Sequence, residues 1–153
     1  MLKSAAAFIS SVLGTVTNDN ANTGYVGEYV SSAVAAGSAV ALTSTATANV
    51  TSISLTAGDW EVTGIVQYTP AAATSVTQLT QGSSSTSATL GAQGTFSKFV
   101  TAANILTAID PAWNLPVTRF SLAATTPIYL VTNATFSVST LTAYGMIRAR
   151  RVR

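Results

Sequence analysis

The alternation of apolar and polar residues is the feature of this sequence that most restricts its fold. Over residues 60–69 the apolar side chains take alternate positions, beginning with Trp60, and polar side chains fill most positions between them. Residues 141–152 repeat the pattern, with one side formed by Leu141, Ala143, Gly145, Ile147 and Ala149. A period of two places side chains on opposite faces of a β-strand, whereas a helix requires a period of about 3.6. The sequence therefore predicts a protein built mainly from strands.

Eight segments have strand character, and turns rich in Gly, Pro, Ser, Thr and Asn separate them. They are residues 25–31, 38–42, 50–55, 60–69, 74–81, 117–123, 128–138 and 141–152. We expect an exposed Ser/Thr-rich loop at 82–89 and an irregular excursion at 92–116, with a helical turn near 102–109. Short strands joined in this way predict an all-β sandwich or barrel, and eight strands with uneven loops fit a jelly roll.

The N-terminal residues have a different period. Apolar side chains recur there at helical spacing, at Leu2, Ala6, Ile9 and Leu13. We predict a short amphipathic helix that ends at Gly14, followed by a polar linker, so that residues 1–23 form an arm ahead of a β-domain of residues 24–153. The helix would pack on its own domain or dock on a neighbouring subunit, and a targeting segment is a third interpretation.

Composition excludes most catalytic chemistry. The chain has no histidine and no cysteine, which excludes a Ser-His-Asp triad, a thiolate nucleophile and the usual zinc sites. Charged residues make up 8% of the chain, against about 25% in ordinary soluble domains. No apolar run approaches the roughly 20 residues of a membrane-spanning helix. We therefore predict no enzyme, no cofactor, no metal and no membrane partner.

Asp59 and Glu61 are the one carboxylate pair whose spacing suits acid–base chemistry. Two positions apart on a strand, their side chains would lie roughly 7 Å apart, not far from the separation of a glycosidase pair. Asp59 follows Gly58 in an expected turn, however, and Glu61 falls on the polar face of its strand. We interpret both as turn and surface residues.

The C-terminal residues carry an unusual concentration of positive charge, in Arg148, Arg150, Arg151 and Arg153. Strand alternation places the first two on one face and the last two on the other, so they form no single stripe for nucleic acid, and no aromatic residue lies between them for base stacking. They would form a solvated end that protects an edge strand, or pair with carboxylates such as Glu28, within the chain or between subunits. We predict no nucleic-acid partner.

Four stretches of the chain resemble segments of tailed-bacteriophage structural proteins. They are Thr-Ser-Ile-Ser-Leu-Thr-Ala-Gly-Asp-Trp-Glu-Val-Thr-Gly at 51–64, Asn-Asp-Asn at 18–20 followed by Gly-Tyr-Val-Gly-Glu-Tyr-Val at 24–30, Thr-Pro-Ile-Tyr-Leu-Val at 126–131, and Ala-Tyr-Gly-Met-Ile-Arg-Ala-Arg-Arg at 143–151. The resemblance implies a homotrimeric β-sandwich of the jelly-roll or tumour-necrosis-factor kind and brings no catalytic residues. In such trimers aromatic side chains often line the three-fold axis, and those placed to do so are Tyr25, Tyr29, Tyr68, Tyr129, Tyr144 and Phe136.

The resemblance implies a structural virion protein, assembled in the bacterial cytoplasm. It would decorate or cement a capsid, or form a head-fibre subunit, in contact with the major capsid protein or other virion subunits. The interface residues we expect are Leu2, Ile9, Leu13, Tyr25, Glu28, Tyr29, Tyr144, Arg148 and Arg150. The alternatives are a tail-tip or tail-fibre module that binds a host glycan or protein through Trp113, and a cellular carbohydrate-binding or adhesion module.

Overall fold

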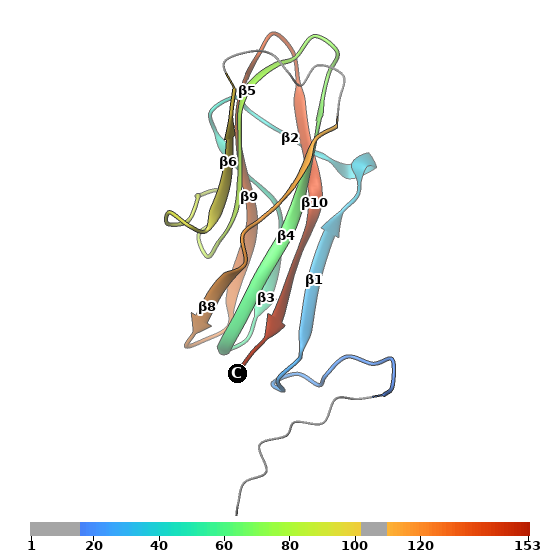
Figure 1. Ribbon diagram of the computed structural model, residues 1–153, viewed down its shortest axis with the longest axis vertical. Coiled ribbons are helices and arrows are strands. Elements are labelled where there is room, and N and C mark those ends of the chain that lie inside the picture. The colour runs from blue at the N-terminus through green and yellow to red at the C-terminus, as the bar shows by residue number, and fades with distance from the viewer. Residues whose placement is uncertain (1–15, 102–109) are drawn as a thin grey trace, which may run out of the picture.

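Two antiparallel sheets face each other in the computed structural model, which describes residues 16–101 and 110–153 (Figure 1). One sheet has the order β1-β10-β4-β7, with β2 also pairing with β10 and β8 with β4. Its strands are β1 (Tyr29–Val34), β2 (Val40–Ala41), β4 (Gly58–Pro70), β7 (Ala112–Asn114), β8 (Thr118–Leu122) and β10 (Leu141–Arg151). The other sheet has the order β3-β9-β5-β6 and contains β3 (Thr47–Leu55), β5 (Ser75–Ser84), β6 (Phe96–Val100) and β9 (Thr126–Ser137). This arrangement confirms the predicted all-β sandwich.

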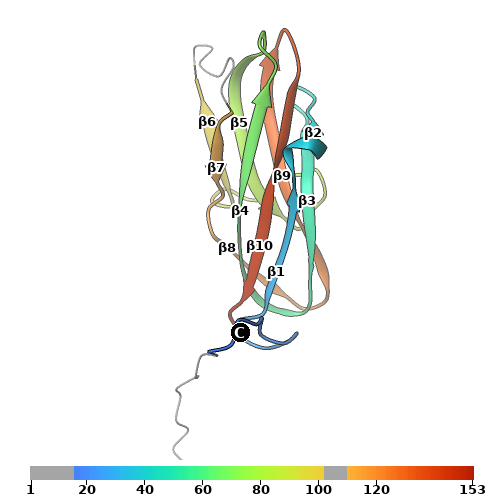
Figure 2. The same cartoon turned by 90° about the vertical axis from the view of Figure 1, so that its right-hand side faces the viewer.

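The core lies between the sheets and contains the side chains that the alternation selects. Trp60, Val62, Val66 and Tyr68 of β4 are fully buried, and Ile147 of β10 lies beside them. The facing sheet contributes Ile53, Leu55, Val76, Leu79, Ile128, Leu130 and Ala134. Figure 2 shows the two layers from the side. Burying apolar side chains between facing sheets is the main term that stabilises such a sandwich.

Tyr68 brings a polar group into this core. Its hydroxyl lies 2.8 Å from Gln81 Oε1 and 2.6 Å from Thr132 Oγ1, both on the opposite sheet. Burial raises the pKa of Tyr68 well above its usual value, although the Thr132 hydroxyl acts in the opposite direction. The ring therefore fills the core while its hydroxyl connects the two sheets.

Several expected boundaries were wrong. The predicted loop at 82–89 begins inside β5, where Ser83 and Ser84 are buried and pair with β9. The predicted excursion at 92–116 contains β6, which pairs with β5, and β7, which pairs with β4. Asp59 lies in β4 rather than in a turn. In each case pairing with a distant strand decides the local structure, and a local pattern does not record that pairing.

The expected strand at 25–31 begins only at Tyr29, because residues 24–28 form a turn. Gly24 and Gly27 have φ values of 88° and 95°, a region in which a side chain is costly, and the Glu28 amide donates to the Tyr25 carbonyl oxygen. The predicted N-terminal helix with Leu2, Ile9 and Leu13, and the helical turn at 102–109, lie outside the described residues. Within residues 16–101 and 110–153, no helix is long and apolar enough to cross a membrane.

Candidate interaction surface at one end of the sandwich

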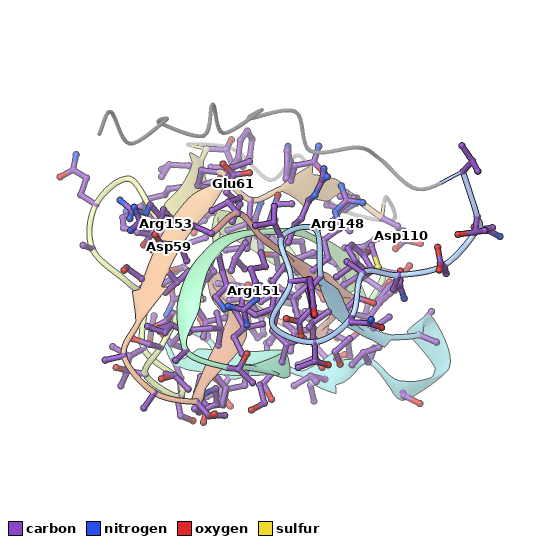
Figure 3. All side chains as sticks on the ribbon, turned by 90° about the horizontal axis from the view of Figure 1, so that it is seen from below. Asp59, Glu61, Asp110, Arg148, Arg151 and Arg153 are labelled. Carbon is purple, nitrogen blue, oxygen red and sulfur yellow. The ribbon has the colours of Figure 1, made fainter. Side chains whose placement is uncertain are left out.

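Most of the charged side chains gather at one end of the sandwich, where the segment before β1 and the C-terminal residues both lie (Figure 1). They are Glu28, Asp59, Glu61, Arg119, Arg148, Arg150, Arg151 and Arg153. Figure 3 shows this end from below, with Arg153 beside Asp59 and Arg151 within the end of the sandwich. The pairing of β10 with β4 and β1 produces this concentration, because the last residues of β10 lie beside the first residues of both.

Glu28 and Arg151 form a buried ion pair that joins the segment before β1 to the last residue of β10. Their side chains are 10% and 5% exposed, and Arg151 Nε donates to Glu28 Oε2 over 2.9 Å. The Gly24 amide donates to the same carboxylate oxygen over 2.8 Å. Burial alone would raise the pKa of Glu28, but the Gly24 amide and the Arg151 guanidinium stabilise the carboxylate more strongly, and the pKa is lowered.

The Arg151 guanidinium has further partners. Its Nη1 donates to the Ala57 carbonyl oxygen over 2.8 Å and its Nη2 to the Thr56 hydroxyl, and its central carbon lies 4.3 Å from the centre of the Trp60 ring. A planar fork that donates in several directions is specific to arginine. Of the sequence interpretations of Glu28, the structure confirms the pair with a tail arginine of its own chain.

Asp59 accepts from two arginines at the same end. Arg119 Nη2 lies 3.0 Å from Oδ1 and 2.9 Å from Oδ2 of the carboxylate, and Arg153 Nη2 also forms an ion pair with it. A hydrogen bond from the Ser121 side chain and the Arg119 guanidinium lower the pKa of Asp59. These partners hold the Asp59 carboxylate in a cluster of ion pairs, whereas the Glu61 side chain is exposed.

On the outer face of the β1–β10–β4 sheet, three charged side chains differ from Glu28 and Asp59 in their pairing. Arg148, Arg150 and Glu61 are exposed there, and no ion pair within 4.0 Å joins any of them to another described residue. They border a hollow of about 450 Å³, whose other lining residues are Asn20, Gly27, Tyr29, Thr63, Val117 and Ala149. Figure 3 shows Glu61 and Arg148 on this outer side.

Two exposed apolar side chains line the same hollow, and two others lie in the turn before β1. Tyr29 and Val117 line it and are 41% and 64% exposed, and Tyr25 and Val26 are exposed in the turn that leads to β1. We call the set formed by Tyr25, Val26, Tyr29, Glu61, Val117, Arg148 and Arg150 the arm-end surface. Tyrosine and arginine are enriched among the residues that dominate protein–protein binding energy. Four of the seven residues of the surface, Tyr25, Tyr29, Arg148 and Arg150, are of these two types.

The other expected contact residues lie elsewhere. Tyr144 is half-buried on β10, further from the charged end. Trp113 on β7 stacks on Phe99 of β6 with ring centres 5.3 Å apart, and its ring lies 6.3 Å from that of Tyr68. It therefore bridges the two sheets along one side of the sandwich, which leaves less of the indole for a sugar ring.

Sequence reasoning missed the contribution of Glu61 and Val117 to this surface. The sequence pattern places Glu61 on a polar face and Val117 at the start of a strand. The register of β4 with β10 and β8 brings them to the hollow. Within the described part of the chain, no group of three or more acidic side chains is placed to hold a metal ion.

Comparisons with known proteins assign the chain to no family. No protein-family model matches it, and no curated protein matches it. Among solved structures it is similar to the crystal structure of infectious bursal disease virus VP2 subviral particle, with a TM-score of 0.40 and 14% identity. The similarity covers 81% of this chain and 30% of that chain, so this chain spans less than a third of that structure's length. The strand pairing of the two antiparallel sheets is what identifies the fold as a β-sandwich.

Proposed function

We propose that this protein is a structural subunit of a tailed-phage particle, a homotrimer that decorates or cements the capsid or forms a head fibre. The observation that carries the proposal is the arm-end surface, which joins exposed Tyr29 and Val117 to arginines without a described carboxylate partner. Such a patch fits binding to another protein surface. The resemblance of residues 18–20, 24–30, 51–64, 126–131 and 143–151 to phage structural proteins supports a phage particle as the assembly.

The mechanism is stabilisation by mass action. A subunit that binds the assembled particle and not its separated proteins lowers the free energy of the particle by RT ln(1 + [L]/Kd) at each site. The Glu28–Arg151 pair supports this role because it fixes the segment before β1 against the sandwich. A fixed segment lowers the entropy that is lost when a neighbouring subunit binds it.

Immunogold labelling of purified phage particles tests this proposal. Gold spread regularly over the heads is the expected result, and it would next direct attention to contacts with the major capsid protein. If purified particles carry no gold while the antibody recognises the isolated protein, the virion role is wrong. Particles from a phage that lacks the gene provide the matched control.

A tail-tip or tail-fibre module that binds a host glycan or protein is the second candidate function. The hollow favours it, because Asn20, Thr63 and Arg148 line it together with Tyr29, which combines hydrogen-bonding groups with an aromatic side chain. Gold confined to the tails would support this second function and contradict the capsid role.

A further inference from the structure

The outer edge of β1 has backbone hydrogen-bonding groups that no described strand pairs with. β1 stands at the end of its sheet, and its pairing is with β10 on the other side. The Arg151 amide donates to the Glu28 carbonyl oxygen, and in an antiparallel pair such bonds recur at every second residue. The intervening residues Tyr29, Ser31 and Ala33 therefore direct their amide and carbonyl groups away from β10, and all three residues are exposed.

This edge also lacks the features that protect sheet edges in soluble proteins. Charged side chains, prolines and bulges prevent an edge from pairing with other chains. β3, the neighbouring edge strand of the other sheet, has a bulge between Asn49 and Thr51, β6 carries Lys98, and β8 carries Arg119. The six residues of β1 include no charge and no proline, and the register of β1 with β10 is continuous. We therefore expect another strand to cover this edge.

The side of the sandwich beside β1 is also closed less completely than the opposite side. On the opposite side, the stacked rings of Trp113 and Phe99 close the space between β7 and β6. Beside β1, the Ser32 and Thr51 hydroxyls, 2.6 Å apart, join β1 to β3 (Figure 2). The apolar side chains packed on the core there are only half-buried, and they are Val30, Val34 and Ala48. A covering strand would therefore bury apolar surface as well as pair the edge.

A segment outside the described residues has the same side-chain pattern as β1. Residues 8–13 read Phe-Ile-Ser-Ser-Val-Leu, and β1 reads Tyr-Val-Ser-Ser-Ala-Val. Both contain, in the same order, an aromatic residue, a β-branched residue, two serines and two apolar residues. The segment has no charge, as the edge has none. With the same alternation as β1, a strand formed by this segment would turn Ile9 and Leu13 toward the half-buried valines.

The chain that leads into β1 favours an antiparallel arrangement within one molecule. Residues 16–28 lie at the end of the sandwich where β1 begins (Figure 1), and the Glu28–Arg151 pair fixes the last of them there. A segment that precedes them can run back along β1, and six extended residues span about 20 Å, the length of β1 itself. A connection within the chain also costs less entropy than the capture of a separate molecule.

We propose that residues 8–13 of this same chain bind the outer edge of β1 as an additional antiparallel strand. Backbone hydrogen bonds to the three outward residues of β1 hold the strand, as in other cases of strand addition. The added strand protects the edge from pairing with other chains and joins the N-terminal arm to the sandwich. Over these residues it excludes the helix predicted from the spacing of Leu2, Ala6, Ile9 and Leu13, and the experiments below decide between the two.

Disulfide trapping tests the contact, because the chain has no cysteine of its own. Opposed residues of paired strands have Cα atoms about 4.5–5.5 Å apart, a separation that a disulfide spans. Ser31→Cys is combined in turn with Phe8→Cys, Ser10→Cys and Val12→Cys, which share its face in the matched pattern. At least one pair should form a disulfide in most molecules at the mass of a single 15.6 kDa chain, and dilution should not reduce the yield.

Two control pairs keep this test specific. Ser11→Cys with Ser31→Cys places the thiols on opposite faces, and Ser54→Cys with Ser10→Cys moves one thiol from the β1 edge to an exposed position on β3. Both pairs should react at least about tenfold more slowly than the best test pair. Equal rates overturn the proposal, and so does a disulfide that joins two chains at every dilution, because the edge then belongs to a second copy. Melting temperatures of the reduced variants confirm folding.

Hydrogen exchange gives a second measurement that needs no cysteine. The Ser31 and Ala33 amides should exchange at least about tenfold more slowly in the intact chain than in Ser11→Pro, because proline interrupts the added strand. The Val30 and Ser32 amides point toward β10 and should not change. Equal exchange of the Ser31 and Ala33 amides in the two proteins overturns the proposal. Neither measurement involves a phage particle, so the result is independent of the virion role.

Discussion

Glu28→Gln should destabilise the fold because it leaves the Arg151 guanidinium buried without its counter-charge. The pair is short and buried, with a 2.9 Å contact and side-chain exposures of 10% and 5%. Removing one partner of a buried ion pair costs about 3–5 kcal/mol in other proteins. Glutamine retains an acceptor for one hydrogen bond, and solvent near the end of the sandwich screens the remaining charge. We therefore expect a loss of about 2–3 kcal/mol.

Urea unfolding at pH 7 and fixed protein concentration measures this loss. Asp110→Asn is the matched control, because it also replaces an exposed carboxylate by its amide, lies outside the arm-end surface and should shift stability by less than about 0.5 kcal/mol. The slope of the free energy against urea should stay the same in both variants. Equal stability of Glu28→Gln and Asp110→Asn would refute the reasoning.

The effect should also depend on pH with a defined sign. The pKa of Glu28 in the folded protein lies below its ordinary value of 4.5. The pair therefore contributes its full stability above pH 4.5 and loses it as the pH falls through the folded pKa. The gap between wild type and Glu28→Gln should narrow on acidification, and a constant gap from pH 7 to pH 2 would contradict an electrostatic origin.

Three other substitutions test the sandwich. Tyr68→Phe should cost about 1–3 kcal/mol in urea unfolding, because a core glutamine and threonine lose their hydroxyl partner; a loss near zero would show that the hydroxyl is not needed. Gly145→Ala should prevent folding or sharply lower the melting temperature, because Gly145 has φ 154° and a Cβ there collides with the Ile65 carbonyl oxygen. Gly37→Ala is the control, because a Cβ at Gly37 meets nothing within 4 Å, and it should leave the melting temperature unchanged. Equal melting temperatures of the two variants would contradict the close approach at Gly145. Asp59→Asn should lower the melting temperature at pH 7, with a difference that shrinks below the ordinary pKa of 3.8; an unchanged profile would contradict the ion pairs.

The fold class could be predicted because apolar side chains take alternate positions along most of β4 and β10. Each has one face buried in the core and one face toward solvent, and the sequence records both faces. The second half of β5 was missed because its serines match the composition of a loop. In the structure Ser83 and Ser84 lie between β9 and the segment leading into β6, and they are buried there by strands distant in sequence.

The arm-end surface could be predicted only in part. Alternation correctly separated Arg148 and Arg150 from Arg151, and Glu28 was correctly matched to an arginine of the tail. That pair spans 123 positions in the sequence, and no local pattern reports which strand lies beside β10. The place of Glu61 beside Arg150 follows from the register of β4 against β10, which depends on packing of the whole core.

Strand parity gives the arginines of one short segment two different tasks. Arg151 points inward to Glu28 and the Trp60 ring, and Arg148 and Arg150 point outward to the hollow. A shift of β10 by one residue would exchange the faces, placing Arg150 inside and Arg151 outside. The apolar side chains of Leu141, Ile147 and Ala149 oppose that shift, because it would move them from the core to the solvent face. The core packing of β10 therefore also fixes which arginines lie on the arm-end surface.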